Sequence, residues 1–142
     1  MKERILDKIK ELKEFISEFE EIIPQSFEDY KKPKDKAACE RYVEKIVEAA
    51  VDTAFLIIKY KKIELPEDDK SAFDILFKNN IITLETSKAM KSAKGMKNII
   101  SHQYDRVNDE VVYESITNEL IRDSKKFIKE IGEWLKSTRY IL

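Results

Sequence analysis

Apolar residues recur every three or four positions along most of the chain, a spacing that lines one face of an α-helix. The first such stretch, residues 2–23, stops at Pro24, because proline lacks the N–H group that continues a helix. Residues 25–35 are mostly polar and predict a connection. The residues expected to face the core in the first helix are Ile5, Ile9, Leu12, Ile16, Phe19 and Ile23.

A second helix is predicted from about residue 36 to residue 61, and its interior is apolar around most of its circumference. Such a helix is expected to be the central and most buried helix of the fold. Pro66 interrupts the pattern, and residues 66–80 predict a short helix whose first turn carries acids, where they complement the helix dipole.

Two more helices follow. Thr83 is a suitable N-cap for a helix over residues 84–101, and a link at residues 103–109 leads to a last helix over about residues 110–139. The core-facing residues are Met90, Ala93, Met96 and Ile100 in the first of these helices, and Val112, Ile116, Leu120, Phe127, Ile131 and Leu135 in the second.

The whole pattern predicts an all-α fold, with residues 1–142 forming a single domain in an up-and-down bundle of about five helices. The chain has two glycines and three prolines, too few for the many tight turns of a β-sandwich or barrel. The first and last helices are long and amphipathic, so they can supply the face of a homodimer.

Composition narrows the chemistry. The net charge is −1, so nucleic-acid binding would have to rest on a local basic patch. With one cysteine, Cys39, and one histidine, we expect no disulfide, no metal site and no cofactor. No signal peptide is visible and no apolar run approaches the roughly 20 residues of a membrane span, so we expect a cytoplasmic protein without a membrane role.

Candidate chemistry gathers in the stretch GMKNIISHQYDRV, residues 95–107. His102 can act as a general acid or base near neutral pH, Lys97 can hold a phosphate, and Tyr104 can accept a covalent modification. Together they suit cleavage of RNA by its own 2′-hydroxyl, which needs acid–base help and a phosphate clamp but no metal. A slowly turning basic stripe approaches from one side: Lys88, Lys91, Lys94 and Lys97.

Helix geometry limits this interpretation. On a continuous α-helix, positions 97 and 102 lie about 140° apart around the axis, so their side chains do not face each other. Either the helix breaks near Ser101 or a second chain completes the site. A two-fold dimer would bring two copies of Lys97 and His102 to one cleft.

Structural interpretations stand beside the functional one. A histidine is favoured at a helix C-terminus by the dipole, and a lysine stripe is commonly a solvated face. Asp52, embedded in the apolar second helix, can bond a hydroxyl or an amide inside the bundle, or pair with a lysine on a neighbouring helix. Tyr104 can be a packing residue with a hydrated hydroxyl.

The segment KNIISHQYDRV, followed by VVYESI, resembles the signature of the HepT-like toxins in the HEPN superfamily. That signature is an arginine, four residues, a histidine, one residue and a tyrosine. ACERYVEKIVEAAVDTAFLIIK resembles the central helix of the family, and LPEDDKSAFDILFKNNIIT its following proline, short helix and turn. The resemblance therefore covers roughly residues 36 to 120 in order.

The resemblance implies a helical homodimer whose active site lies in the cleft between chains, acting as a metal-independent ribonuclease. It also implies a nucleotidyltransferase-fold antitoxin that transfers AMP to the signature tyrosine. By position, His102 matches the catalytic histidine and Tyr104 the modified residue. Asp52 would be a supporting carboxylate, and Lys94 and Asn98 would help to bind RNA.

The sequence departs from the family at Lys97, where the signature has arginine. Arginine holds a phosphate with a planar two-pronged donor, whereas lysine is a point charge on a flexible stem. A second hypothesis is therefore a non-catalytic HEPN module that binds nucleotide or RNA and pairs with a nucleotidyltransferase-fold protein. A third is a structural helical dimer in which His102 has no special role.

Overall fold

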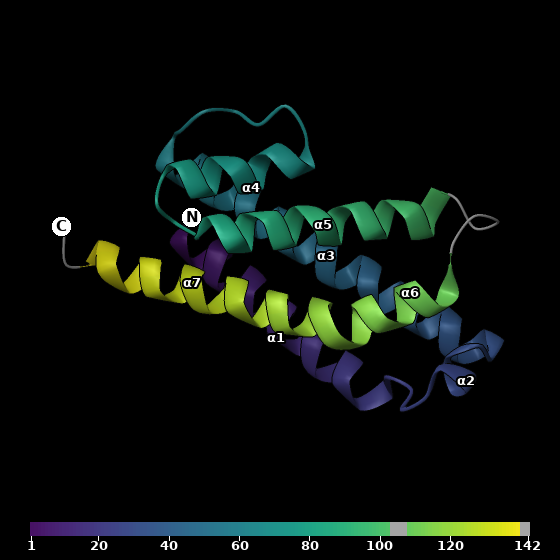
Figure 1. Cartoon of the computed structure of the whole chain (residues 1–142). Helices are drawn as coiled ribbons and strands as arrows, with labels where there is room; N and C mark the ends of the chain where they lie inside the picture. Colours follow the sequence, from purple (N-terminus) through teal and green to yellow (C-terminus); the bar gives the residue numbers. More distant parts are fainter. Residues whose placement is uncertain (103–107, 140–142) are drawn as a thin grey trace.

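The computed structural model describes residues 1–102 and 108–139, and these residues form helices without any strand. Long helices make up most of the structure: α1 (Lys2–Ile22), α3 (Pro33–Lys61), α5 (Leu84–His102) and α7 (Ile121–Arg139). Successive long helices run in opposite directions, so the chain forms an up-and-down bundle (Figure 1). The predicted all-α bundle is confirmed. No described helix is both long and apolar enough to cross a membrane.

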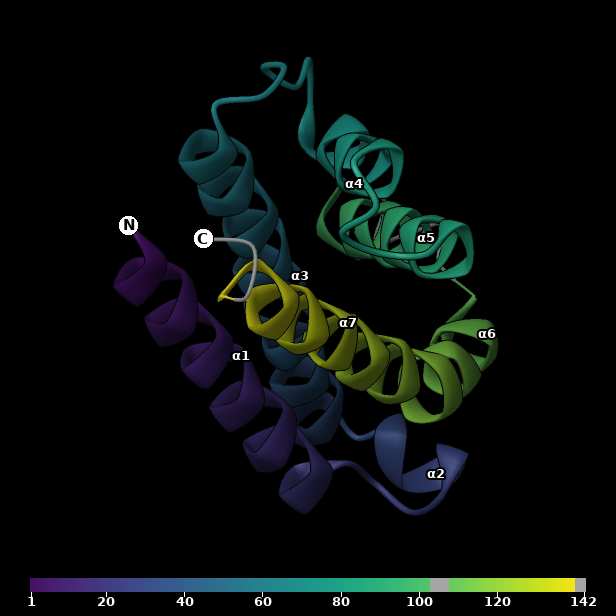
Figure 2. The ribbon, with the colours of Figure 1, turned by 90° about the vertical axis from the view of Figure 1, so that its left-hand side faces the viewer.

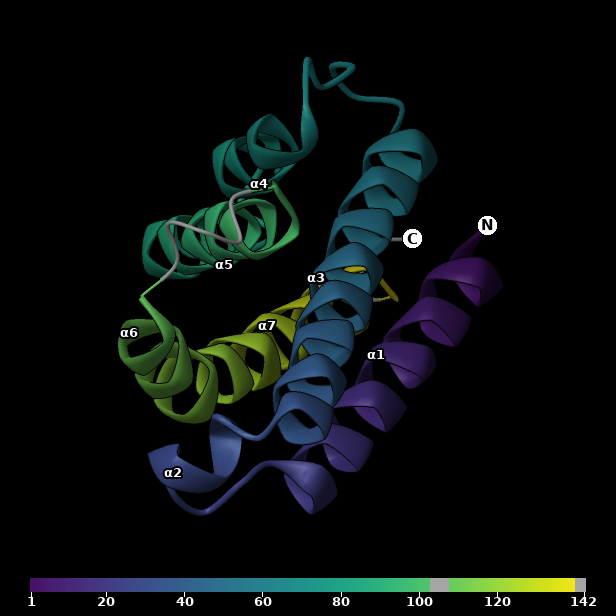
Figure 3. The same ribbon diagram turned by 90° about the vertical axis from the view of Figure 1, so that its right-hand side faces the viewer.

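Helix α3 lies at the centre of the bundle. Figures 2 and 3 show that α1 lies along one side of α3. Helix α5 and the short helix α4 (Asp69–Lys78) lie on the opposite side of α3. Helix α7 packs against both α1 and α5. The buried residues of α3 point in all directions, as the sequence predicts for a central helix: Cys39, Val43, Ile46, Val47, Ala49, Ala50, Val51, Thr53, Ala54, Ile57 and Ile58.

Residues 25–35 are more ordered than the predicted connection. They include the one-turn helix α2 (Phe27–Tyr30), and α3 begins at Pro33 rather than near residue 36. The hydroxyl of Ser26 caps α2 by accepting a hydrogen bond from the Asp29 N–H at 3.1 Å. Proline suits the first position of a helix, where its missing N–H would have no partner. A single turn is too short to show helical periodicity, which is why the pattern does not predict α2.

The start of α5 agrees with the sequence, whereas α4 begins three residues after the predicted residue 66. Asp68 accepts a hydrogen bond from the Ser71 N–H at 2.8 Å, and Ser71 returns one, which makes a capping box at the start of α4. Thr83 accepts from the Thr86 N–H at 3.2 Å, which confirms it as the N-cap of α5. These two caps determine the residues at which α4 and α5 begin.

The last predicted helix contains a wider turn. It is divided into α6 (Asp109–Glu114), a π-helical segment η2 (Ser115–Leu120) and α7. The Thr117 hydroxyl donates to the Tyr113 carbonyl at 2.7 Å, a contact that competes with the regular backbone ladder. All six predicted core residues of this stretch are buried, so the widened turn keeps the apolar face directed at the bundle.

One polar contact joins α5 to α7 near the start of α5. The carboxylate of Glu130 accepts hydrogen bonds from the Thr83 N–H at 2.7 Å and from the buried Thr86 hydroxyl at 2.6 Å. Glu130→Ala leaves both donors without this acceptor, so we expect the free energy of unfolding to fall by about 1–3 kcal/mol.

Urea unfolding followed by circular dichroism measures this change. Glu133→Ala, at an exposed position three residues further along α7, is the control and should stay within about 0.5 kcal/mol of the parent. Equal midpoints for the two variants would show that the Glu130 contact does not stabilise the α5–α7 packing.

Candidate functional site

Helix α5 continues without interruption to His102, which is its last residue and is exposed. A helix break near Ser101, one of the two alternatives given by the sequence, does not occur. Lys97, which is partly buried, therefore points about 140° away from His102 around the axis and stands about 7.5 Å before it along the helix. Within one chain the two residues therefore lie on different sides of α5. Tyr104 lies outside the described residues.

Residues 108 and 109 are tied to the bundle by polar contacts. Asn108 caps α6, accepting hydrogen bonds from the Glu110 and Val111 N–H groups at 3.1 and 3.2 Å. Asp109 forms an ion pair with Lys36 of α3, with 3.1 Å between nitrogen and oxygen. His102 is the last residue of α5, and Asp109 is the first residue of α6.

A half-buried acid lies beside this ion pair. Glu40 is one helical turn after Lys36 on α3. Burial raises the pKa of the Glu40 carboxyl, Lys36 acts to lower it, and the negative charge of Asp109 raises it further. Arg41, the next residue of α3, bonds Glu44 at 2.6 Å. Nothing in the sequence signals that Asp109, far along the chain, joins Glu40 and Lys36.

The predicted lysine stripe of α5 is partly used to hold α4. Lys91 pairs with Asp74 at 3.0 Å, and Lys94 pairs with Asp69 at 2.9 Å. The Lys94 side chain is only 14% exposed, so little of its charge is presented to solvent. Asn98 is partly buried on the same helix. RNA binding by Lys94 and Asn98 stays a prediction.

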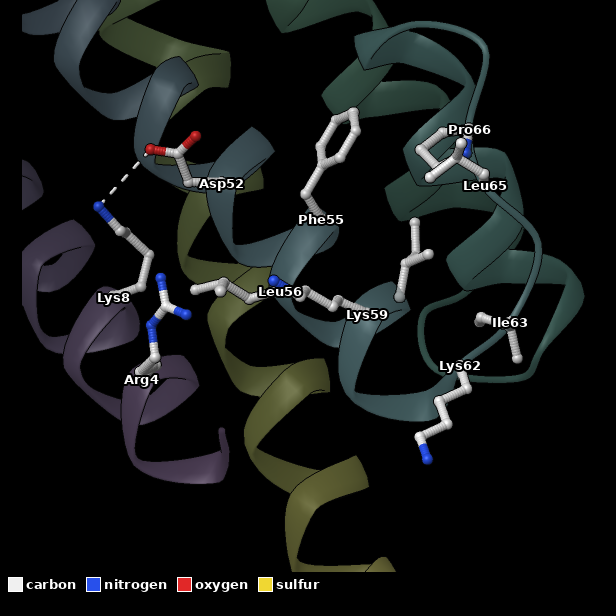
Figure 4. Close-up of a pocket in the computed structure, with 11 residues that line it drawn as sticks. Arg4, Lys8, Asp52, Phe55, Leu56, Lys59, Lys62, Ile63, Leu65 and Pro66 are labelled. Carbon is white, nitrogen blue, oxygen red and sulfur yellow. Dashed lines mark ion pairs between the residues drawn. The ribbon is translucent and has the colours of Figure 1, made fainter.

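Asp52 is not buried in the bundle. Its side chain is 58% exposed and pairs with Lys8 of α1 at 3.5 Å, which agrees with the ion-pair alternative. Figure 4 shows the pair at one end of a pocket between α1, the second half of α3 and the loop that follows α3. The structure therefore groups Asp52 with Lys8 and not with His102 of the same chain. Among the described residues, no three histidine, cysteine or carboxylate side chains cluster to hold a metal ion.

The model of the HepT-like ribonuclease family matches residues 5–131 of the chain. The chain belongs to the HepT-like ribonuclease family. The mRNA nuclease HepT of Shewanella oneidensis is 29% identical over 89 residues, which cover 63% of this chain and 66% of that protein, just under two thirds. A candidate RNase of Archaeoglobus fulgidus is 28% identical over 135 residues, covering 95% of this chain and 96% of that one.

Solved structures show the same fold. The AMPylated HEPN toxin of Shewanella oneidensis, in complex with its MNT antitoxin, superposes with a TM-score of 0.83 at 24% identity, covering 91% of this chain and 96% of that one. The cytosolic protein YutE of Bacillus subtilis, of unknown function, superposes with a TM-score of 0.81 at 17% identity, covering 96% and 92%. The HepT-like bundle is thus retained at low sequence identity.

Glu40 gives this HepT-like chain a testable pH dependence. Because the folded pKa of Glu40 is raised, its contribution to stability is present in acid and is lost as the pH rises through that pKa. Glu40→Gln removes a partly desolvated charge, so we expect the free energy of unfolding to increase at pH 7 and the gain to shrink towards about pH 4.

Urea midpoints of the variant and parent at pH 4, 5.5 and 7 measure this difference. Glu44→Gln, whose partner is Arg41 at the surface, is the matched control and should change stability by less than about 1 kcal/mol. A gain for Glu40→Gln that is equal at all three pH values would contradict the assigned burial effect.

Proposed function

We propose that the chain is a metal-independent ribonuclease toxin whose active site forms in the cleft between two copies. The observation that carries this proposal is the uninterrupted helix α5, which keeps Lys97 and His102 of one chain apart. Family membership supports the reaction class, and a second chain supplies the missing half of the site. Each reacting phosphate would meet Lys97 of one copy and His102 of the other.

The chemistry follows from these two groups. A His102 imidazole takes the proton of the RNA 2′-hydroxyl, whose oxygen then attacks the adjacent phosphorus. The bond from phosphorus to the 5′-oxygen breaks, and that oxygen takes a proton from a water molecule. The products are a 2′,3′-cyclic phosphate and a 5′-hydroxyl. Lys97 stabilises the negative charge on the phosphate oxygens as it builds.

Control would act through Tyr104, two residues after the catalytic histidine. The Shewanella toxin is AMPylated and is bound to an MNT antitoxin, and we propose a nucleotidyltransferase-fold partner of this kind for the present chain. AMP on Tyr104 would place a bulky negative charge next to His102, which repels an RNA phosphate and blocks its approach.

A second function is favoured by one residue. Lysine at position 97, in place of the signature arginine, can hold a phosphate without the two-pronged geometry that orients it for attack. A non-catalytic HEPN module that binds RNA or nucleotide beside the same partner is the alternative. It shares the fold and the cleft, and differs in lacking cleavage.

Cleavage of labelled messenger and transfer RNA in EDTA tests the ribonuclease. We expect His102→Ala to lower the rate by about 100-fold or more, since a positioned acid or base contributes that much. Lys88→Ala, at an exposed position on the same helix, is the control for a general loss of positive charge.

Two results would favour the binding module instead. One is an inert parent that still binds RNA as an intact dimer. The other is the appearance of cleavage in Lys97→Arg when the parent has none, because the arginine would then supply what the parent lacks. Cleavage by His102→Ala at the parental rate would exclude His102 as the proton carrier.

Mixed dimers test whether the site spans two chains. Two differently tagged copies, one with Lys97→Ala and one with His102→Ala, are co-expressed and purified through both tags. Each homodimer variant should be inactive, while the mixed dimer should recover a large part of the parental activity, because Lys97 of one copy meets His102 of the other.

The reverse arrangement provides the control. A wild-type copy paired with a copy that carries both substitutions should be inactive if the site spans the chains, and about half active if each chain has its own complete site. Activity in this second dimer, with none in the first, would rule out the cleft between copies as the place of reaction.

A further inference from the structure

A pocket of about 670 Å³ opens beside the start of α1, away from the end of α5 that carries His102. Its walls come from α1, from the second half of α3 and from the loop that begins at Lys62 (Figure 4). Most of the uncharged lining is apolar, including Leu65, whose side chain is 85% exposed. Its size falls within the range of pockets that bind small molecules or short polymer segments.

The charges around this pocket are uneven. Four cations line it, Arg4, Lys8, Lys59 and Lys62, against the single acid Asp52, which is already paired with Lys8. The whole chain has 27 basic and 28 acidic residues, so this surface is far more positive than the average. Arg4, Lys59 and Lys62 take part in none of the ion pairs found among residues 1–102 and 108–139.

The cations are spread along the pocket and do not converge on one point. Figure 4 shows Arg4 and Lys8 along one wall, Lys59 near the middle and Lys62 at the far side. Figure 4 shows the partly buried ring of Phe55 on the side of the pocket towards Leu65 and Pro66, and Lys59 follows it one turn later on α3. A single phosphate is best held by converging donors, whereas separated cations with an aromatic ring to one side suit several phosphates joined by a backbone.

We propose that this pocket binds single-stranded RNA at a distance from the cleavage site. The proposal rests on the proposed ribonuclease function and deepens it by naming the form of RNA that is bound. Phosphates contact Arg4, Lys59 and Lys62, and a base packs against Phe55 and the neighbouring aliphatic side chains. Base stacking on a side chain requires an unstacked base, so the pocket selects single strands over duplexes.

The test measures RNA binding rather than cleavage. All proteins carry His102→Ala, so the RNA stays intact, and the full-length chain is titrated against fluorescein-labelled single-stranded RNA and against the matched duplex. Anisotropy at several salt concentrations gives the dissociation constant and its salt dependence. We expect the single strand to bind more tightly than the duplex.

Neutralising two pocket cations tests the phosphate contacts. Arg4→Gln with Lys59→Gln should weaken binding about tenfold or more and reduce the slope of log K against log salt by about 1.4, which is the loss of two phosphate contacts on a single strand. Lys10→Gln with Lys13→Gln removes the same charge from an exposed part of α1 outside the pocket and should leave both quantities nearly unchanged.

Substitutions at Phe55 test the base contact. Phe55→Leu keeps an apolar side chain but removes the ring, so it should weaken single-strand binding about tenfold without changing the salt slope. Phe55→Tyr keeps the ring and should bind as the parent does. Thermal melting of each variant shows whether it remains folded.

Outcomes at the pocket and at the cleavage site are separable. Pocket variants that bind single strands as tightly as the parent overturn the pocket, even if the parent cleaves RNA through His102. Equal losses for the pocket pair and the control pair also overturn it, because they indicate only a general charge effect. Weakened binding in the pocket variants supports the pocket even if the parent cleaves no RNA.

Discussion

The apolar surface of α3 is the constraint on which the rest of the bundle depends. Because its buried residues lie around almost its whole circumference, α3 has to be covered on several sides at once. One long helix cannot do this, so α1 covers one side while α4 and α5 cover another, and α7 packs across α1 and α5. The direction of α5 is therefore set by α3, and with it the position of His102.

Regular helix geometry then determines what one chain can do. Helical turns have a fixed angle, and α5 stays regular to its end, so Lys97 and His102 leave the helix axis about 140° apart. A continuous helix is also lower in free energy than a broken one, since a break would leave backbone N–H and C=O groups without hydrogen-bond partners. The geometry that makes the bundle stable is thus the same geometry that places these two residues on different sides of α5.

Helix periodicity predicts the fold well because each long helix buries one apolar stripe, and such a stripe is visible in the sequence. The cap residue Thr83 predicts the start of its helix for a similarly local reason. The pattern does not predict helix α2 or the π-helical turn, because a single turn carries too few residues to show a period. The partners of Asp52 and Lys94 could not be assigned, since ion pairs between helices depend on how the helices pack.

The net charge of the chain does not show which of its cations are paired with acids. The lysine stripe of α5 looks like a basic surface in the sequence, yet Lys91 and Lys94 are paired with acids of α4 and so contribute little field at the surface. The more positive surface is formed by cations of α1, of the end of α3 and of the loop after it, which are far apart in the sequence. An RNA strand that reaches from that pocket to the end of α5 would have to run along the bundle. The length of the RNA, as well as its sequence, would therefore determine its affinity.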